Sequence, residues 1–316
     1  MSKYILPTYS RINITFTHGK GPWLYTQNKK KFLDFASGIA VNSLGHCHPK
    51  MVNAICKQSK KLWHTSNLYH IKEQENLAKI LCKESFAESV FFCNSGAEAT
   101  EGIVKMIRRY HYINGNKNKK NILVVDNAFH GRTLTSLAAG SNLKHREGFF
   151  AFDDCLCGFI RVPSNDLSAL IQKIDSQTAA VFLEPIQGEG GINVMSKNYI
   201  NSIRKICNDN EILLAVDEVQ CGIGRTGKMF AYQWSDIVPD LMTLAKGMGG
   251  GFPIGAVLAT NKIASAMVPG THGSTFGGNQ LACVISNVVI AEVSKKYFLD
   301  NVISVGNFIK KELEKL

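Results

Sequence analysis

The sequence lacks the features that would place it in a membrane or in an oxidising compartment. None of its apolar runs approaches the roughly 18–20 residues of a membrane-spanning helix. Its nine cysteines, an odd number, are scattered without a CxxC pair, and its first residues lack the basic start and apolar stretch of a secretory signal. No internal repeat or low-complexity tract interrupts its 316 residues. We therefore expect no membrane partner, no disulfide framework, no secretory signal, and a cytoplasmic location.

What the sequence does have is a globular composition and an excess of positive charge. Hydrophobic residues make up 45% and charged residues 19%, which is enough apolar material for a packed core. The 36 basic and 25 acidic residues give a net charge of +11. The basic clusters are short, at residues 29–31, 117–120, 295–296 and 310–311. We therefore expect no nucleic-acid partner, and we read the charge as a lysine-rich background or as a requirement for binding anions.

The order of apolar runs predicts an α/β fold. The first forty-odd residues indicate short strands and turns. From about residue 50, short apolar runs occur at residues 90–92, 122–125, 179–183, 212–216, 241–244 and 256–259. Helix-period segments lie between several of them, for example at Tyr199, Ile203 and Ile206. Strands that are apolar on both faces and alternate with helices predict a mostly parallel sheet covered by helices on both sides. Ligands of such sheets bind at the carboxyl ends of the strands.

The first candidate site is the junction at Ser95. An apolar run leads into a turn of small residues, and Ser95 with Glu98 three residues later fits a capping box at a helix start. A helix N-terminus presents free backbone N–H groups and the positive end of a dipole, which suits a phosphate. An ordinary helix cap without a ligand remains the alternative.

Two further runs end in charged residues. Residues 212–216 lead into Asp217 and Glu218, and a carboxylate at the end of a buried strand is costly unless it has a cationic partner. Either side chain could bind a metal, act as a base, pair with a protonated ring nitrogen or cap a helix. Residues 241–245 lead into Lys246 and a glycine-rich loop. Desolvation can leave such a lysine neutral and nucleophilic, able to form a Schiff base.

Two other patterns are rejected on context. Residues 222–227 match GxGxxG, but polar residues separate them from the preceding strand and no amphipathic helix follows. His46, Cys47 and His48 are adjacent and have no distant pair of Cys or His ligands, so we expect no metal there or elsewhere.

Taken in order, the motifs resemble those of the class III aminotransferases, which use pyridoxal 5′-phosphate (PLP). The shared segments lie at residues 44–49, 94–99, 129–133, 184–191 and 217–220, at Lys246 with its glycines, and at residues 274–279. The resemblance implies a fold-type I PLP-dependent transferase. It further implies an N-terminal segment of the small domain at 1–45 and a PLP-binding large domain at 46–280. Residues 281–316 would be a connecting helix and the start of a C-terminal small domain.

The resemblance also assigns cofactor contacts. Lys246 would hold PLP covalently and move protons, and Asp217 would pair with the ring nitrogen. Gln220 would contact the ring hydroxyl side and Phe129 would stack on the ring. The phosphate would lie on Ser95, Gly96 and Ala97, with Thr275 supplied by the neighbouring subunit of a homodimer. Glu218 and Val219, in the same motif as Asp217, are counted with the cofactor site.

For the substrate, the resemblance implies transamination of N-acetylornithine with 2-oxoglutarate, a step of arginine biosynthesis. Arg132 would clamp a carboxylate, Ser274 would contact the same substrate, and Glu189 would be a gating acid. Glu189 pairs in the family with an arginine of the C-terminal domain, which this resemblance places beyond Leu316. Ornithine, succinylornithine and 4-aminobutyrate are alternative substrates, although His130, where ornithine-specific members usually have Trp, argues against ornithine. A non-catalytic PLP-binding dimer is the alternative of a different class.

Overall fold

A computed structural model describes residues 4–149 and 158–316. Its centre is a seven-stranded sheet with strand order β4-β12-β11-β10-β7-β5-β6. The strands are β4 (Ser89–Cys93), β5 (Asn121–Val125), β6 (Phe159–Val162), β7 (Thr178–Leu183), β10 (Leu213–Asp217), β11 (Leu241–Leu244) and β12 (Gly255–Ala259). Only β12 runs antiparallel to its neighbours, β11 and β4. The predicted α/β fold with a mostly parallel sheet is confirmed.

Alternate residues of each central strand enter two different cores. In β10, Leu214 and Val216 pack with one cluster of buried side chains, and Leu213 and Ala215 pack with another. The first cluster includes residues of α3 (Lys72–Glu84), α8 (Lys197–Asp209) and α10 (Gln280–Val293). The second includes residues of α4 (Gly96–Ile113) and α9 (Asn261–Ala264). The side-chain period of two therefore decides which helical layer each strand residue faces.

Shorter elements complete the large sheet's surroundings. They are α5 (Leu134–Ala139), α6 (Leu143–Arg146), α7 (Leu167–Gln172), the hairpin β8 (Ile186–Gln187) with β9 (Asn193–Val194), and the 3-10 turns η1 (Ala231–Trp234) and η2 (Lys246–Met248). The rejected GxGxxG segment is a loop followed by η1. Its Gly224 and Gly227 have positive φ and lie close to Val293 and Ile303, so they permit close packing against α10 and against α11 (Lys296–Leu313).

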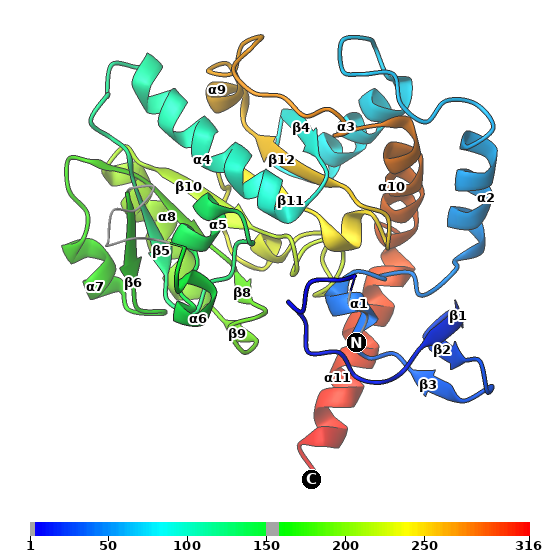
Figure 1. Ribbon diagram of the computed structural model, residues 1–316. Helices are drawn as coiled ribbons and strands as arrows, with labels where there is room; N and C mark the ends of the chain where they lie inside the picture. The colour runs from blue at the N-terminus through cyan, green and yellow to red at the C-terminus, as the bar shows by residue number, and fades with distance from the viewer. Residues whose placement is uncertain (1–3, 150–157) are drawn as a thin grey trace.

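A second, smaller part of the chain lies below the large sheet in Figure 1. It contains the antiparallel sheet β1 (Phe16–Lys20), β2 (Trp23–Thr26) and β3 (Lys31–Leu33), the short α1 (Ser37–Ala40), and the end of α11 (Lys296–Leu313). The helix α2 (Pro49–Gln58) packs beside α10. Within the described ranges, none of the helices combines the length and apolar character needed to cross a membrane.

Candidate active site

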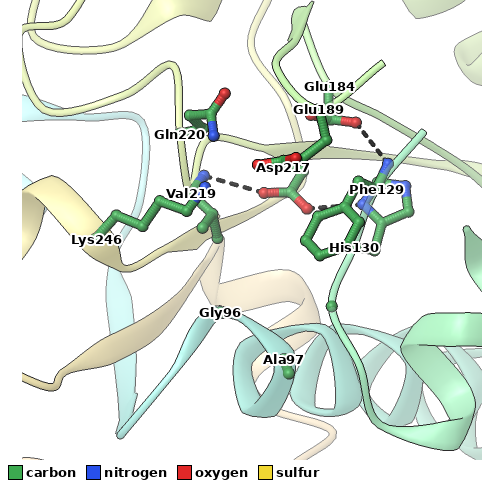
Figure 2. A pocket seen from close by; sticks show the side chains of 11 residues that line it. Gly96, Ala97, Phe129, His130, Glu184, Glu189, Asp217, Val219, Gln220 and Lys246 are labelled. Atoms are coloured by element: carbon green, nitrogen blue, oxygen red, sulfur yellow. Dashed lines mark hydrogen bonds and ion pairs between the residues drawn. The ribbon is translucent and has the colours of Figure 1, made fainter. Parts of the chain in front are cut away.

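The carboxyl ends of the central strands surround a cavity. Its lining comes from the start of α4 and from the residues that follow β5, β7, β10 and β11, namely Gly96, Ala97, Phe129, His130, Gly131, Glu184, Glu189, Asp217, Val219, Gln220 and Lys246. These segments are far apart in sequence, and the parallel strands bring them to one edge of the sheet (Figure 1). Figure 2 shows their side chains converging on the cavity.

One wall of the cavity is the N-terminus of α4. Ser95 is the N-cap, and its hydroxyl accepts from the Glu98 N–H at 3.2 Å. The Glu98 carboxylate accepts from the Asn94 N–H at 3.0 Å rather than from the N-cap, so only the first half of the predicted capping box forms as the motif describes. Helix geometry leaves the N–H groups of Gly96 and Ala97 without intrahelical acceptors. The start of α4 is therefore suited to hold an anion.

Asp217 is the anionic centre of the cavity. It ends β10 and is 4% exposed. Its Oδ2 lies 2.7 Å from Nδ1 of His130, and its Oδ1 accepts from the Val219 N–H at 3.0 Å and the Thr243 hydroxyl at 2.9 Å. The His130 ring stacks on Phe182 with centroids 4.1 Å apart. These contacts fix the carboxylate in one orientation and compensate its burial.

Glu218 lies on the opposite side of the strand end. Because side chains alternate, Asp217 continues the face of Ala215, whereas Glu218 continues the face of Val216. Its carboxylate is fully buried and accepts from the N–H groups of Ala231 and Tyr232, each at 2.6 Å. Burial raises the pKa of Glu218 to about 7. The sequence resemblance counted Glu218 with the cofactor site, but in the structure Glu218 does not line the cavity. Val219 and Gln220 do line it.

Lys246 enters the cavity from the end of β11. It has a φ of +41°, a left-handed conformation that is unusual for a residue with a side chain. Desolvation lowers the pKa of Lys246, against the opposing effect of the Glu189, Asp217 and Glu184 carboxylates. In Figure 2 its side chain extends toward Asp217. A partly desolvated amine in this position has an increased neutral, nucleophilic fraction.

Glu184 is a second buried carboxylate of the cavity. It is 5% exposed, follows β7, and accepts from the N–H groups of Phe129 at 2.9 Å and Gly188 at 3.3 Å. Desolvation, with a smaller contribution from the charge of Asp217, raises the pKa of Glu184 to about 7 against the opposing effect of His130 and the two N–H groups.

The substrate-contact candidates occupy the rim or another surface. Arg132 is exposed, with its Nη2 3.0 Å from Nε2 of His145 and its guanidinium 5.5 Å from the Phe129 ring centroid. Glu189 is exposed and lines the cavity. Ser274 and Thr275 instead line a separate hollow beside Ser66 and Asn67. This chain alone therefore does not bring Ser274 or Thr275 to the Lys246 cavity.

The cavity walls fit an aromatic ring with a phosphate. A Cβ on Gly96 would lie 2.9 Å from Val219, and a Cβ on Gly131 would lie 2.7 Å from the Cβ of Ala97. These glycines keep the backbone close around the cavity. The buried Nε2 of His130 has no partner among the described atoms. Amides of a helix start, an amine, a carboxylate and a flat aromatic side chain together match the phosphate, aldehyde, ring nitrogen and ring face of PLP.

His130 and Glu184 are site residues to which the sequence motifs assigned no role. Both lie inside the shared motifs, but the contact of Glu184 with Phe129 N–H and that of His130 with Asp217 depend on how the segments after β5, β7 and β10 meet. No local pattern in the sequence specifies that meeting. Within residues 4–149 and 158–316, no three His, Cys, Asp or Glu side chains gather as metal ligands. His46 contacts Asp34 at 2.8 Å.

Comparison with known proteins places these features in a family. The sequence profile of the class III aminotransferases matches residues 4–316. The acetylornithine aminotransferase 1 of Bradyrhizobium diazoefficiens is 47% identical over 310 residues, which cover 98% of this chain and 76% of that protein. The acetylornithine aminotransferase of Clostridium acetobutylicum is 49% identical over 298 residues, covering 94% of this chain and 76% of that protein.

Solved structures agree. The N-acetylornithine aminotransferase of Stenotrophomonas maltophilia has a TM-score of 0.83 and 35% identity, covering 97% of this chain and 75% of that one. An ornithine aminotransferase of Toxoplasma gondii, described with partial occupancy of PLP at its active site, has a TM-score of 0.94 and 30% identity, covering 99% of this chain and 74% of that one. With the profile match over nearly the whole sequence, these similarities establish that the chain belongs to the class III aminotransferases.

Proposed function

We propose that this chain uses PLP to transfer the δ-amino group of N-acetylornithine to 2-oxoglutarate, giving N-acetylglutamate 5-semialdehyde and glutamate in arginine biosynthesis. The observation that carries the proposal is the convergence of Lys246, Asp217 and the start of α4 on one cavity. The acetylornithine aminotransferases to which the chain is similar support the choice of substrate.

The proposed binding of PLP uses groups of known position. The N–H groups of Gly96 and Ala97, beside Ser95, would hold the phosphate, because the helix dipole favours negative charge there. Phe129 would cover one face of the ring, and Val219 and Gln220 line the same cavity. Asp217 would pair with the ring nitrogen and favour its protonated form, because a buried carboxylate is stabilised by a cationic partner. When bound, PLP supplies an electron sink for the substrate carbon that loses a proton.

Lys246 is the proposed nucleophile and proton carrier. Its amine would hold the cofactor covalently, and the free neutral amine could accept and return a proton. Desolvation favours this neutral form because it lowers the pKa of Lys246. The same amine serves both half-reactions, so we expect ping-pong kinetics.

The residues that select the substrate lie, in this proposal, at the rim of the Lys246 cavity. Arg132 presents a planar cation that can bind a carboxylate through two parallel hydrogen bonds. Glu189, on the loop after β8, lies near the Lys246 amine and affects its charge. We assign Glu189 to gating between the amino substrate and the dicarboxylic acceptor.

The proposed active unit is a cytoplasmic homodimer. Ser274 and Thr275 lie away from the cavity of their own chain, and we assign them to the substrate and the phosphate of a partner's site. We also propose the division into an N-terminal segment at 1–45, a PLP-binding domain at 46–280 and a connecting helix with the start of a small domain at 281–316. We propose no nucleic-acid partner, and we read the remaining charge as a lysine-rich background or as a requirement for binding anions.

Borohydride reduction tests the cofactor assignment. Reduction of the PLP-loaded protein should fix the cofactor on the peptide that contains Lys246, as mass spectrometry would show. The Lys246→Ala variant should lose the visible absorbance of lysine-bound PLP while still folding. An unchanged spectrum in that variant would remove Lys246 from its proposed role.

Turnover measurements test the substrate. Acetylornithine should be converted much faster than ornithine or 4-aminobutyrate at equal concentration. Equal rates on all three would contradict the specific substrate. Bound PLP whose spectrum does not respond to acetylornithine would favour a non-catalytic PLP-binding protein.

A further inference from the structure

The loops after β5 and β7 meet at the cavity, and Glu184 makes one of the contacts between them. One carboxylate oxygen accepts from Phe129 N–H on the first loop, and the other accepts from Gly188 N–H on the second. Phe129 leads into His130 and Gly131, and Gly188 is followed by Glu189. A single side chain thus connects the loop that faces the cofactor ring with the loop that carries the rim acid.

Two other contacts hold the same pair of loops. The Gln187 side chain donates to the Asp126 carbonyl at 2.6 Å. A Cβ on Gly190 would lie 3.1 Å from the Cβ of Asn127, so the two backbones approach closely there. The loops are therefore packed against each other, and Glu184 sits at the end of the seam nearest the cavity.

The chemistry of the contact requires a side chain with two acceptors. Both oxygens of a carboxyl group can accept from an N–H group, whether the group is ionised or protonated, whereas the amide of glutamine offers one acceptor and one donor group. In a Glu184→Gln variant, one of the two N–H groups would face an NH2 group, which cannot accept its hydrogen bond. A buried N–H group without an acceptor is energetically unfavourable, so the substitution would destabilise the position of one of the two loops.

From this geometry we propose that Glu184 is a positioning residue, which fixes Phe129 against the PLP ring and holds the Glu189 loop at a set distance from it. The part that concerns PLP rests on the proposed function. The part that concerns the two loops rests on the chain alone.

Amide hydrogen exchange tests the loop connection without cofactor. In Glu184→Gln, the amides of Phe129 and Gly188 should exchange faster than in the parent protein. Glu218→Gln is the matched control, because Glu218 is also buried and accepts from two backbone N–H groups. That variant should speed exchange at Ala231 and Tyr232 instead. Unchanged exchange at both Phe129 and Gly188 in Glu184→Gln would overturn the proposal.

Cofactor binding tests the positioning. Glu184→Gln should bind PLP about tenfold more weakly and change the visible circular dichroism of the bound cofactor, which reports ring orientation. Asp240→Asn is the control for general destabilisation, because Asp240 accepts from Leu214 N–H near the other end of β10. It should leave both quantities unchanged. Faster exchange with parental PLP affinity and dichroism would restrict Glu184 to loop packing and overturn its role toward the cofactor, whereas absence of PLP binding in the parent protein would overturn the proposed function itself.

Discussion

At the scale of single residues, the contact between His130 and Asp217 can be separated from ring packing. His130→Phe keeps a ring against Phe182 and removes the 2.7 Å contact with Asp217. Loss of a charge-assisted hydrogen bond should reduce kcat by about tenfold or more, since such bonds contribute about 1.5–3 kcal/mol. Steady-state kinetics with PLP saturating measure the effect, and His130→Asn, which keeps a donor, should recover part of the rate. Parental kcat in both variants would show that Asp217 does not need its contact with His130.

Arg132 allows a test of substrate binding that spares the cofactor. Its guanidinium is exposed at the rim and is not among the residues that line the cavity. Arg132→Lys keeps the charge but loses the two-pronged geometry, so KM for acetylornithine should rise about tenfold. Arg132→Ala should raise it further, while the PLP dissociation constant stays at the parental value in both. A fall in PLP affinity without a change in KM would move Arg132 from the substrate to the cofactor.

Individual residues differ in how far the sequence predicts them. Lys246 and Asp217 stand out because a charged residue ends an apolar run. The alternation of side chains along a strand also predicts that Glu218 points away from the cavity, because a residue one position beyond Asp217 must face the other core. The role of Glu184 could not be read in this way, because it depends on Phe129 and Gly188 from loops that meet only in the fold.

At the scale of elements, the sequence predicts the strands that form short runs of apolar residues. All six predicted apolar runs correspond to strands of the large sheet. The unpredicted strand is β6, at the sheet edge, which is largely half-buried and contains Arg161. Arg161 donates to backbone carbonyls of Ala138 and Gly140, a use for its charge that a local pattern cannot indicate. Sequence therefore predicts the apolar strands, including β4 at the opposite edge, but not the edge strand β6 that contains an arginine.

The attachment of η1 to the end of β10 should make stability depend on pH. Glu218 accepts from Ala231 and Tyr232, and its pKa is raised from 4.5 to about 7 by burial. The folded chain then binds more protons than the unfolded chain between these values, so the contribution of Glu218 to stability is full below about pH 4.5 and falls as pH rises through about 7. Glu184 acts in the same direction.

Glu218→Gln should therefore flatten the decline of unfolding free energy between about pH 5 and 7. One proton changes the slope by at most about 1.4 kcal/mol per pH unit. Urea denaturation at several pH values measures this slope, with Glu292→Gln as the control, because the half-buried Glu292 has a pKa of about 2, which lies below the window. An identical slope in parent and Glu218→Gln would contradict the assignment.

At the scale of the whole molecule, two distant loops form one surface. The Asn67 side chain donates to the carbonyls of Ser274 and Gly277, and Gln74 donates to Asn67. The same two segments expose large apolar side chains, namely Trp63, Leu68, Tyr69 and Phe276. Gathered apolar exposure of this kind is typical of a protein interface. No single stretch of sequence contains this surface, because residues 63–69 and 274–277 meet only through the fold.

Leu68→Asp should disrupt a dimer formed through this surface. Leu68 is 88% exposed in the single chain, so a charge costs little there, whereas burial of that charge between two chains would be strongly unfavourable. Light scattering should give the parent protein twice the 34.8 kDa mass of one chain, and it should give the variant the mass of one chain. PLP affinity should fall as well, because Thr275 of the partner would no longer reach the phosphate.

The control variant is Val238→Asp, at an exposed position on a different loop, which should change neither mass nor PLP affinity. A variant that stays dimeric would place the subunit contact elsewhere, and a monomer with parental PLP affinity would remove Thr275 from the phosphate site.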